Sequence, residues 1–197
     1  MRLGAPVQGP WNDPEEWVAQ HQALGYGAAF SPVNDPNDAA GLKAYREAAE
    51  RHDLVIAEVG AWSNPISADD DTRKAAVALC QERLAAAEAI GARCCVNISG
   101  SRGKQWDGPH PDNLTDETFA LIVDTVRAIL DAVKPTRTYY TLETMPWMYP
   151  DSTDSYLRLL QAVDRDRFAV HFDPVNLVCS PQRYFGNAAL IREFVDT

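Results

Sequence analysis

The sequence predicts an α/β fold in which helices cover a parallel sheet, and three observations support this class. Short apolar runs alternate with helical patterns along the whole chain. Regular alternation of this kind is typical of parallel strands joined by right-handed crossovers. No linker, low-complexity segment or shift in composition interrupts the pattern, and 197 residues are enough to bury one sizeable core. A single domain over residues 1–197 is therefore expected.

The apolar runs predict six strands. Each run is short and largely apolar, as expected for strands buried in a sheet. The predicted strands cover residues 3–7, 26–33, 54–62, 93–99, 138–142 and 167–172.

Helix signals lie between these strands. Pro14 begins a helix that ends before Gly25, and Gly91 closes a long helix over residues 70–90. Thr115 can cap the next long helix. The remaining predicted helices are 38–52, one that begins after Asp151 or Ser152, and 187–197.

Two architectures fit this order of elements: an open, doubly wound sheet and a (β/α)₈ barrel. The nucleotide fingerprint GxGxxG and the P-loop are both absent. Barrel enzymes carry their catalytic groups at the carboxyl ends of several strands. Two acids occupy such positions here, Glu143 in "TYYTLETMP" and Asp173 in "FAVHFDPVN". These observations favour the barrel, of which the chain would supply about six of the eight β/α units.

Composition and charge narrow the classes of function. The net charge of −10 argues against a nucleic-acid partner or an anionic membrane surface, since both attract basic proteins. No apolar run is long enough to span a bilayer, and the N-terminus lacks the apolar core of a signal peptide. The four cysteines show no metal-binding spacing. Free thiols in a reducing compartment explain them, so a cytoplasmic location is expected.

Alternation along the strands predicts which side chains meet inside the barrel. Thr141 and Glu143 share one face of their strand, and His171 and Asp173 share one face of the next. The same count places Asn97 on the polar face of the strand over residues 93–99. We expect Glu143, Asp173, His171 and Asn97 to converge at the top of the barrel.

Carboxylates brought this close repel one another, so either one of them holds a proton or a cation lies between them. Oxygen ligands, with an imidazole nearby, suit Mg²⁺, Mn²⁺, Zn²⁺ or Co²⁺. The alternative is that Glu143 and Asp173 cap helices or pair with arginines. The spacing of the two residues leaves both readings open.

The motifs "TLETMP" and "HFDPVN" resemble the xylose isomerase-like TIM-barrel family, in particular its sugar phosphate isomerases/epimerases. "VGAWSNPIS", "AIGARCCVNISGS" and "NLVCSPQRYFGNAALIREF" are similar to that family as well, so the resemblance covers the whole chain. It implies one divalent metal ion (Mn²⁺, Mg²⁺, Co²⁺ or Zn²⁺) bound by Glu143 and Asp173. It also implies that Glu143 is an acid/base group that removes a proton next to a carbonyl, through a metal-stabilised enediolate.

The family pattern also includes a His on strand seven and a Glu on strand eight. The sequence ends at Thr197, after the sixth predicted strand. The resemblance therefore implies a member that is incomplete at its C-terminus, with half of the metal site and one of the two acid/base groups. Whether this chain is active without those two groups is an open question.

Further side chains are candidates for contact with a small sugar or polyol substrate. Aromatic rings at barrel mouths often stack on sugars, and an arginine can hold a phosphate or carboxylate with two hydrogen bonds. Interior packing, hydrogen bonding or a structural ion pair explains the same residues as well. The substrate-binding candidates are Trp62, Asn64, Asn97, His171, Asn176 and Arg183.

Several functions remain open within this resemblance. A sugar or sugar phosphate isomerase/epimerase is the primary expectation. An inosose dehydratase-like lyase and a non-catalytic, truncated barrel are the alternatives. The AP endonuclease family 2 shares the fold, but its additional zinc-binding histidines have no counterparts here, and the acidic charge disfavours DNA. The oligomeric state is not predicted, and a homo-oligomer is one of the options.

Overall fold

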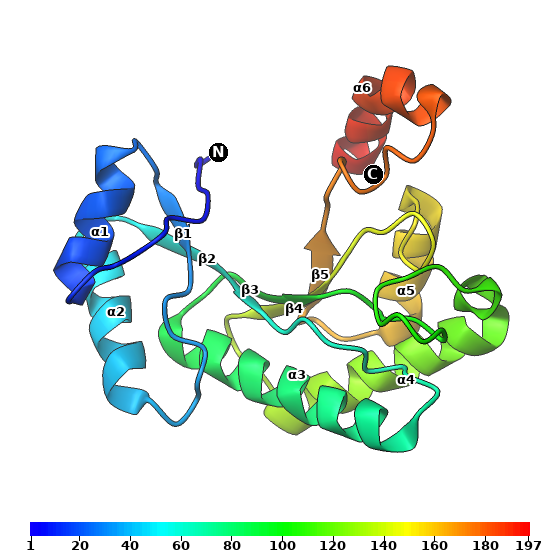
Figure 1. Ribbon diagram of the computed structural model, residues 1–197, viewed down its shortest axis with the longest axis horizontal. Coiled ribbons are helices and arrows are strands. Elements are labelled where there is room, and N and C mark those ends of the chain that lie inside the picture. Colours follow the sequence, from blue (N-terminus) through cyan, green and yellow to red (C-terminus); the bar gives the residue numbers. More distant parts are fainter.

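The computed structural model describes residues 1–197, which form five β-strands and six α-helices in alternation. Helix α1 precedes the first strand, and a helix follows each strand after that (Figure 1). The strands are β1 (Ala28–Phe30), β2 (Val55–Gly60), β3 (Cys94–Asn97), β4 (Tyr139–Glu143) and β5 (Phe168–His171). The helices are α1 (Pro14–Ala23), α2 (Ala39–Arg51), α3 (Asp70–Ile90), α4 (Asp116–Val133), α5 (Thr153–Val163) and α6 (Pro181–Asp196), with a 3₁₀ turn, η1 (Pro111–Leu114), before α4.

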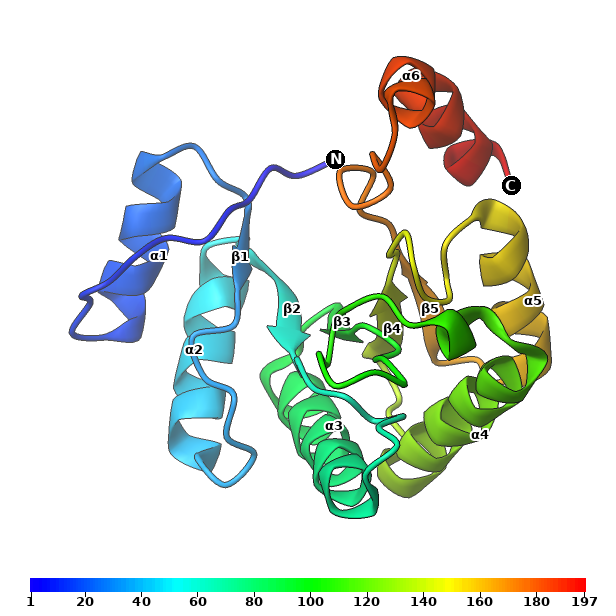
Figure 2. The same ribbon diagram turned by 45° about the vertical axis from the view of Figure 1, so that its right-hand side comes forward.

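The five strands form one parallel sheet in the order β1-β2-β3-β4-β5. Figure 2 shows helices α1 to α5 as an arc on the convex side of this curved sheet. Helix α6 lies apart from that arc, beyond the ends of the strands, in both views (Figures 1 and 2). Sequential parallel strands with helices on one side form part of a (β/α)₈ barrel, so the predicted fold class is confirmed. None of the helices is both long and apolar enough to cross a membrane.

The predicted first strand, over residues 3–7, is wrong. Only Gly4 pairs with β1, in an isolated parallel bridge to Ala28. Pro6 has no backbone N–H to donate, which limits how far this segment can extend the sheet. A Cβ at Gly4 would lie 2.4 Å from the carbonyl oxygen of Ala28, so only glycine allows this close approach. The remaining predicted strands correspond to β1 through β5.

Capping residues mark the helix boundaries, among them the expected Gly91, Thr115 and Ser152. Asp69 caps α3 by accepting a hydrogen bond from the Thr72 N–H, and Gly91 ends the helix with φ of 80°, where glycine is favoured. Thr115 caps α4, and Ser152 caps α5 in a capping box with Ser155. These caps fix where each helix begins relative to the strand that precedes it.

The core lies between the sheet and the helices. Tyr140 and Leu142 of β4 and Cys95 of β3 point toward α3 and α4 and are fully or almost fully buried. Leu84 and Ile90 of α3 complete the centre of this layer. Burying these apolar side chains stabilises the convex side by about 25 cal/mol per Å² removed from water. The concave side of the sheet therefore carries the polar side chains.

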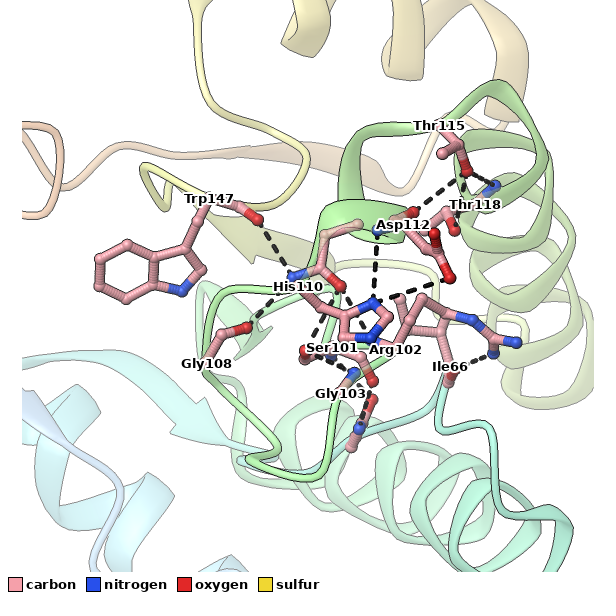
Figure 3. Close-up of polar contacts among 12 residues, drawn as sticks. Ile66, Ser101, Arg102, Gly103, Gly108, His110, Asp112, Thr115, Thr118 and Trp147 are labelled. Atoms are coloured by element: carbon pink, nitrogen blue, oxygen red, sulfur yellow. Dashed lines mark hydrogen bonds and ion pairs between the residues drawn. The ribbon is translucent and has the colours of Figure 1, made fainter.

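The loop over residues 98–110, after β3, is held by a buried polar network (Figure 3). The fully buried Asn113 accepts hydrogen bonds from the Arg102 N–H (2.8 Å) and the Ser101 hydroxyl (3.3 Å). Its amide donates to the carbonyl oxygens of Gly108 and Trp147, each at 3.1 Å. In the structure, the polar residues of the loop attach it to the segment that follows β4.

Candidate functional site

A cavity of about 500 Å³ opens on the concave side, at the carboxyl ends of β1, β2, β4 and β5. Parallel strands direct these ends to the same side of the sheet, which is where barrel enzymes carry their active sites. Seven of its nine lining residues are not hydrophobic, so the cavity suits a polar ligand. The lining residues are Phe30, Ser31, Asn34, Glu58, Gly60, Trp62, Glu143, His171 and Asp173.

Glu143 and Asp173 both lie in this cavity. Glu143 is the last residue of β4, and Asp173 follows the end of β5. Thr144 joins the two strand ends: its hydroxyl donates to the Asp173 carbonyl oxygen and accepts from the Asp173 N–H, each at 3.0 Å. These two hydrogen bonds couple the backbone after β4, which carries Glu143, to the backbone after β5, which carries Asp173.

Asn176 orients both carboxylates. Its side-chain amide donates to Glu143 Oε1 at 2.8 Å, and its backbone N–H donates to Asp173 Oδ1 at 3.3 Å. The N–H of Val175 also donates to Asp173 Oδ1, at 2.7 Å. Asn176 does not line the cavity itself, and its hydrogen bonds hold the carboxylates of the two acids in place.

The electrostatics of Glu143 are unusual. Burial and the neighbouring Asp173 carboxyl raise the pKa of Glu143 to about 7. Glu143 therefore binds a proton more readily than an exposed glutamate does. The two acids present carboxylate oxygens to one cavity, and this set of donors fits a hard divalent cation.

Glu58 is a cavity residue that the sequence does not predict. The pairing of β1 with β2 shifts register between Ala29 and Phe30, so that Ala29 pairs with Ile56 and Phe30 with Glu58. This bulge adds one residue to β2 and turns Glu58 toward the concave side. Simple alternation would place Glu58 with Ile56 on the helix side. The available signal is an acid inside the otherwise apolar run "VIAEVG".

Glu58 forms an ion pair across the cavity with His171, whose Nε2 lies 3.0 Å from Glu58 Oε2. Burial disfavours the charged imidazole, but the hydrogen bond and the charge of Glu58 outweigh it, so the pKa of His171 is raised. The two side chains are 17% and 26% exposed, respectively, which limits screening by solvent. The cavity thus contains an acid–imidazole pair beside the two acids.

The remaining substrate-binding candidates occupy different places. Trp62 lines the cavity, and its indole lies against Gly60, where a Cβ would be 2.4 Å from the indole nitrogen. Asn64 is buried and exchanges hydrogen bonds with the backbone of Ser101, so it holds the loop. Arg183 is exposed near the start of α6 and does not line the cavity.

The predicted direction of Asn97 is wrong. Its side chain is fully buried and donates to Cys80 Sγ of α3 at 3.3 Å, on the helix side of the sheet. Its Oδ1 accepts from the N–H of Ser63 at 3.2 Å. Asn97 therefore does not converge with Glu143, Asp173 and His171. The other three members of the predicted cluster do lie together.

The fold and the cavity define a class: a TIM-barrel chain with an acidic pocket at the carboxyl ends of its strands. The family model described as "Xylose isomerase-like TIM barrel" matches residues 18–194. The chain belongs to this family.

Several solved structures resemble the chain. A putative xylose isomerase from Rhodospirillum rubrum gives a TM-score of 0.74 at 16% identity, covering 100% of this chain and 73% of that one. The probable 3-DHS dehydratase AsbF from Bacillus anthracis gives 0.69 at 16% identity, covering 100% and 69%. D-allulose 3-epimerase from Methylomonas sp., in complex with D-allulose, gives 0.66 at 18% identity, covering 91% and 65%. At these identities the likeness shows the fold, and the chain spans about two thirds of the length of these proteins. A sequence search of curated proteins gives no match.

Proposed function

We propose that the protein is a divalent-metal-dependent isomerase or epimerase of a sugar or sugar phosphate. One observation carries the proposal: Glu143 and Asp173, at the carboxyl ends of the neighbouring strands β4 and β5, lie in one cavity. A carboxylate within hydrogen-bonding reach of a bound substrate can accept a proton from it and return it. The sugar epimerases among the structurally similar proteins support the same class of reaction.

In this proposal Glu143 has two roles, as a metal ligand and as an acid/base group. It would take a proton from the carbon next to the substrate carbonyl, and the amide of Asn176 would keep its carboxylate directed at the cavity. Asp173 would be the second ligand. A bound divalent ion would polarise the carbonyl and hydroxyl oxygens of the substrate and favour the enediolate. Trp62, at the cavity wall, would pack on the sugar carbons.

The proton transfer can be tested without knowing the product. The chain is incubated with Mn²⁺ in D₂O and with each of several free and phosphorylated ketoses, such as D-fructose, D-fructose 6-phosphate, D-allulose and D-tagatose, and NMR follows exchange of the hydrogen next to the carbonyl. We expect exchange into at least one ketose. Glu143→Gln should reduce the rate by about 100-fold or more, since general acid/base groups typically contribute that much.

The exposed acid Glu82 on α3 provides the control, because it makes no side-chain hydrogen bond or ion pair. Glu82→Gln should exchange at the rate of the unmodified chain. Absence of exchange with every ketose, or equal exchange in the Glu143→Gln variant, would overturn the proposal.

A dehydratase is the second candidate, favoured by the likeness to the probable 3-DHS dehydratase. Removal of the same proton by Glu143 could lead to loss of a neighbouring hydroxyl as water instead of return of the proton. Mass spectrometry distinguishes the two: an epimerase leaves the mass of the substrate unchanged, whereas a dehydratase lowers it by one water. A non-catalytic barrel would give neither outcome.

A further inference from the structure

Three potential metal ligands from three strands converge below the rim of the cavity. They are Glu58 of β2, Cys94 of β3 and His171 of β5, and their ligand atoms all lie within 4.8 Å of one another. Glu58 and Cys94 are partners in the register of β2 and β3. The bulge in β2 turns the Glu58 side chain to the face that carries Cys94 and His171. Cys95, on the other face, is buried in the core.

The three side chains have unused capacity to bind a ligand. His171 Nδ1 is buried and has no hydrogen-bond partner. The contact of Cys94 Sγ is a weak one, with the Ala57 carbonyl oxygen at 3.6 Å. Glu58 Oε2 contacts His171 Nε2 at 3.0 Å, a separation that two ligands of one metal ion also have.

We propose that Glu58, Cys94 and His171 form a second metal site, for a thiophilic divalent cation of the Zn²⁺ class, separate from the Glu143–Asp173 pair. Thiolate, imidazole and carboxylate are the ligands that zinc takes in proteins, at about 2.0–2.3 Å. Ligand atoms bound at these lengths lie roughly 3–4 Å apart, so small rotations of the side chains would close the site. Three protein ligands leave a fourth position for water or another small ligand, and two of the three, Glu58 and His171, line the cavity.

Binding would release a proton from the cysteine. Burial raises the pKa of Cys94 to about 11, so the metal-free thiol is protonated, and the cation displaces that proton when the S–metal bond forms. A hard cation such as Mg²⁺ gains little from a thiolate, whereas Zn²⁺ and Co²⁺ gain much. The two neighbouring sites thus differ in the cations that they prefer. The oxygen ligands of Glu143 and Asp173 favour a hard cation, whereas the sulfur, nitrogen and oxygen ligands of Cys94, His171 and Glu58 favour a thiophilic one.

Co²⁺ is the probe, because a thiolate ligand gives it a charge-transfer absorption band that oxygen and nitrogen ligands do not. Titration of the reduced chain with Co²⁺ should produce this band with a stoichiometry of one, and Zn²⁺ should abolish it by displacement. Cys94→Ser should remove the band. The exposed Cys179 supplies the matched control, and Cys179→Ser should keep the band. Glu143→Gln should also keep it, so this test does not depend on the proposed enzymatic function.

Two further variants cover the case in which Cys94→Ser does not fold. Glu58→Gln and His171→Gln should each weaken Co²⁺ binding, read from the same band, by at least about tenfold, as loss of a ligand or of its hydrogen-bonding partner typically does. Absence of the band in the unmodified chain, or a band that persists in Cys94→Ser, would overturn the proposal. Unchanged affinity in both the Glu58 and the His171 variants would do the same. The three side chains would then form only an ion pair beside a protonated thiol.

Discussion

At the scale of single residues, Asn176 shows how a side chain outside the cavity can control the acids inside it. Its amide donates to Glu143 Oε1 at 2.8 Å, and its backbone N–H contacts Asp173. Hydrogen bonds of this kind fix the orientation of metal ligands and are often worth a factor of 10–100 in affinity, to order of magnitude (about 1–3 kcal/mol). Asn176 thus links the two carboxylates through both its side chain and its backbone.

Asn176→Ala should therefore weaken Mn²⁺ binding by about tenfold, while the chain remains folded. Isothermal titration calorimetry with Mn²⁺ measures the affinity. Asn37 is a suitable control, because its amide contacts only Asp35 in an exposed turn. Equal affinities in the Asn176→Ala and Asn37→Ala variants would show that Asn176 does not support a metal site.

Which residues of the site are predictable from the sequence depends on the regularity of each strand. Glu143 and His171 are predicted to face the cavity because β4 and β5 pair without interruption, so alternation holds along them. Glu58 is not predicted to face the cavity, because the bulge in β2 reverses the direction of its side chain. In β3 the sequence "CCVN" has apolar residues on both faces, so its pattern gives no contrast that would show which way Asn97 points.

At the scale of elements, Glu88 of α3 fastens the segment that leads into β4. Its carboxylate accepts hydrogen bonds from the N–H groups of Thr136 (3.1 Å), Arg137 (3.2 Å) and Thr138 (2.9 Å). It also accepts one from the Thr136 hydroxyl at 2.7 Å. Burial alone would raise the pKa of Glu88, but these hydrogen bonds lower it to about 2, from 4.5.

A lowered pKa in the folded state means that this carboxylate stabilises the protein above pH 4.5 and that the contribution is lost as the pH falls toward 2. Glu88→Gln should lower the free energy of unfolding at pH 7 by about 1–3 kcal/mol, the usual cost of losing charged hydrogen bonds. The difference from the unmodified chain should shrink as the pH falls through this window. Urea denaturation at a series of pH values measures this difference in the free energy of unfolding. Glu82→Gln, on the exposed side of α3, should show no such pH-dependent difference.

The loop after β3 provides a second test at this scale. Asn113 is fully buried and satisfies four polar groups from Ser101, Arg102, Gly108 and Trp147. Asn113→Ala leaves these groups unpaired and should cost about 1–3 kcal/mol of stability. It should also speed proteolysis within the loop, since the loop would open locally. Gln105→Ala, in the same loop, removes only an exposed contact with Asp107 and should leave both measurements unchanged.

The elements differ in how far the sequence specifies them. Helix α3 is predicted to the residue, because its helical pattern begins at Asp70 and Gly91 marks its end. The apolar run at residues 3–7 is not a strand, since it makes a single bridge and contains a proline. Short apolar runs have no periodicity long enough to distinguish a strand from an extended segment. A single sequence does not show that an asparagine such as Asn113 is buried. It therefore does not show whether the loop around that asparagine has a structural or a functional role.

At the scale of the whole molecule, the sheet has two outer strands, β1 and β5. A closed barrel has no such edges, whereas an open edge presents unpaired N–H and C=O groups that attract another strand. Order and direction of the strands are predictable, because regular β/α alternation imposes parallel neighbours. The sequence does not predict how much of the outer edge of β5 is covered, since that depends on where α6 packs. In the structure the ring of Phe194 of α6 stacks on that of Phe172, which directly follows β5, with ring centroids 4.1 Å apart.

The open edge at β5 and exposed apolar side chains on β5 and α6 predict self-association. Val170 of β5 is 46% exposed, and Tyr184 and Phe185 of α6 are 66% and 85% exposed. Apolar groups next to an unpaired strand favour contact with a second copy of the chain, because burial would remove them from water and pair the free backbone groups. Sedimentation velocity over a range of concentrations should therefore show reversible association, and Phe185→Glu should shift it toward monomer. Leu24, 60% exposed after α1, provides the control. A chain that stays monomeric at every concentration, or one that Leu24→Glu dissociates as effectively, would show that the surface of β5 and α6 is not the contact.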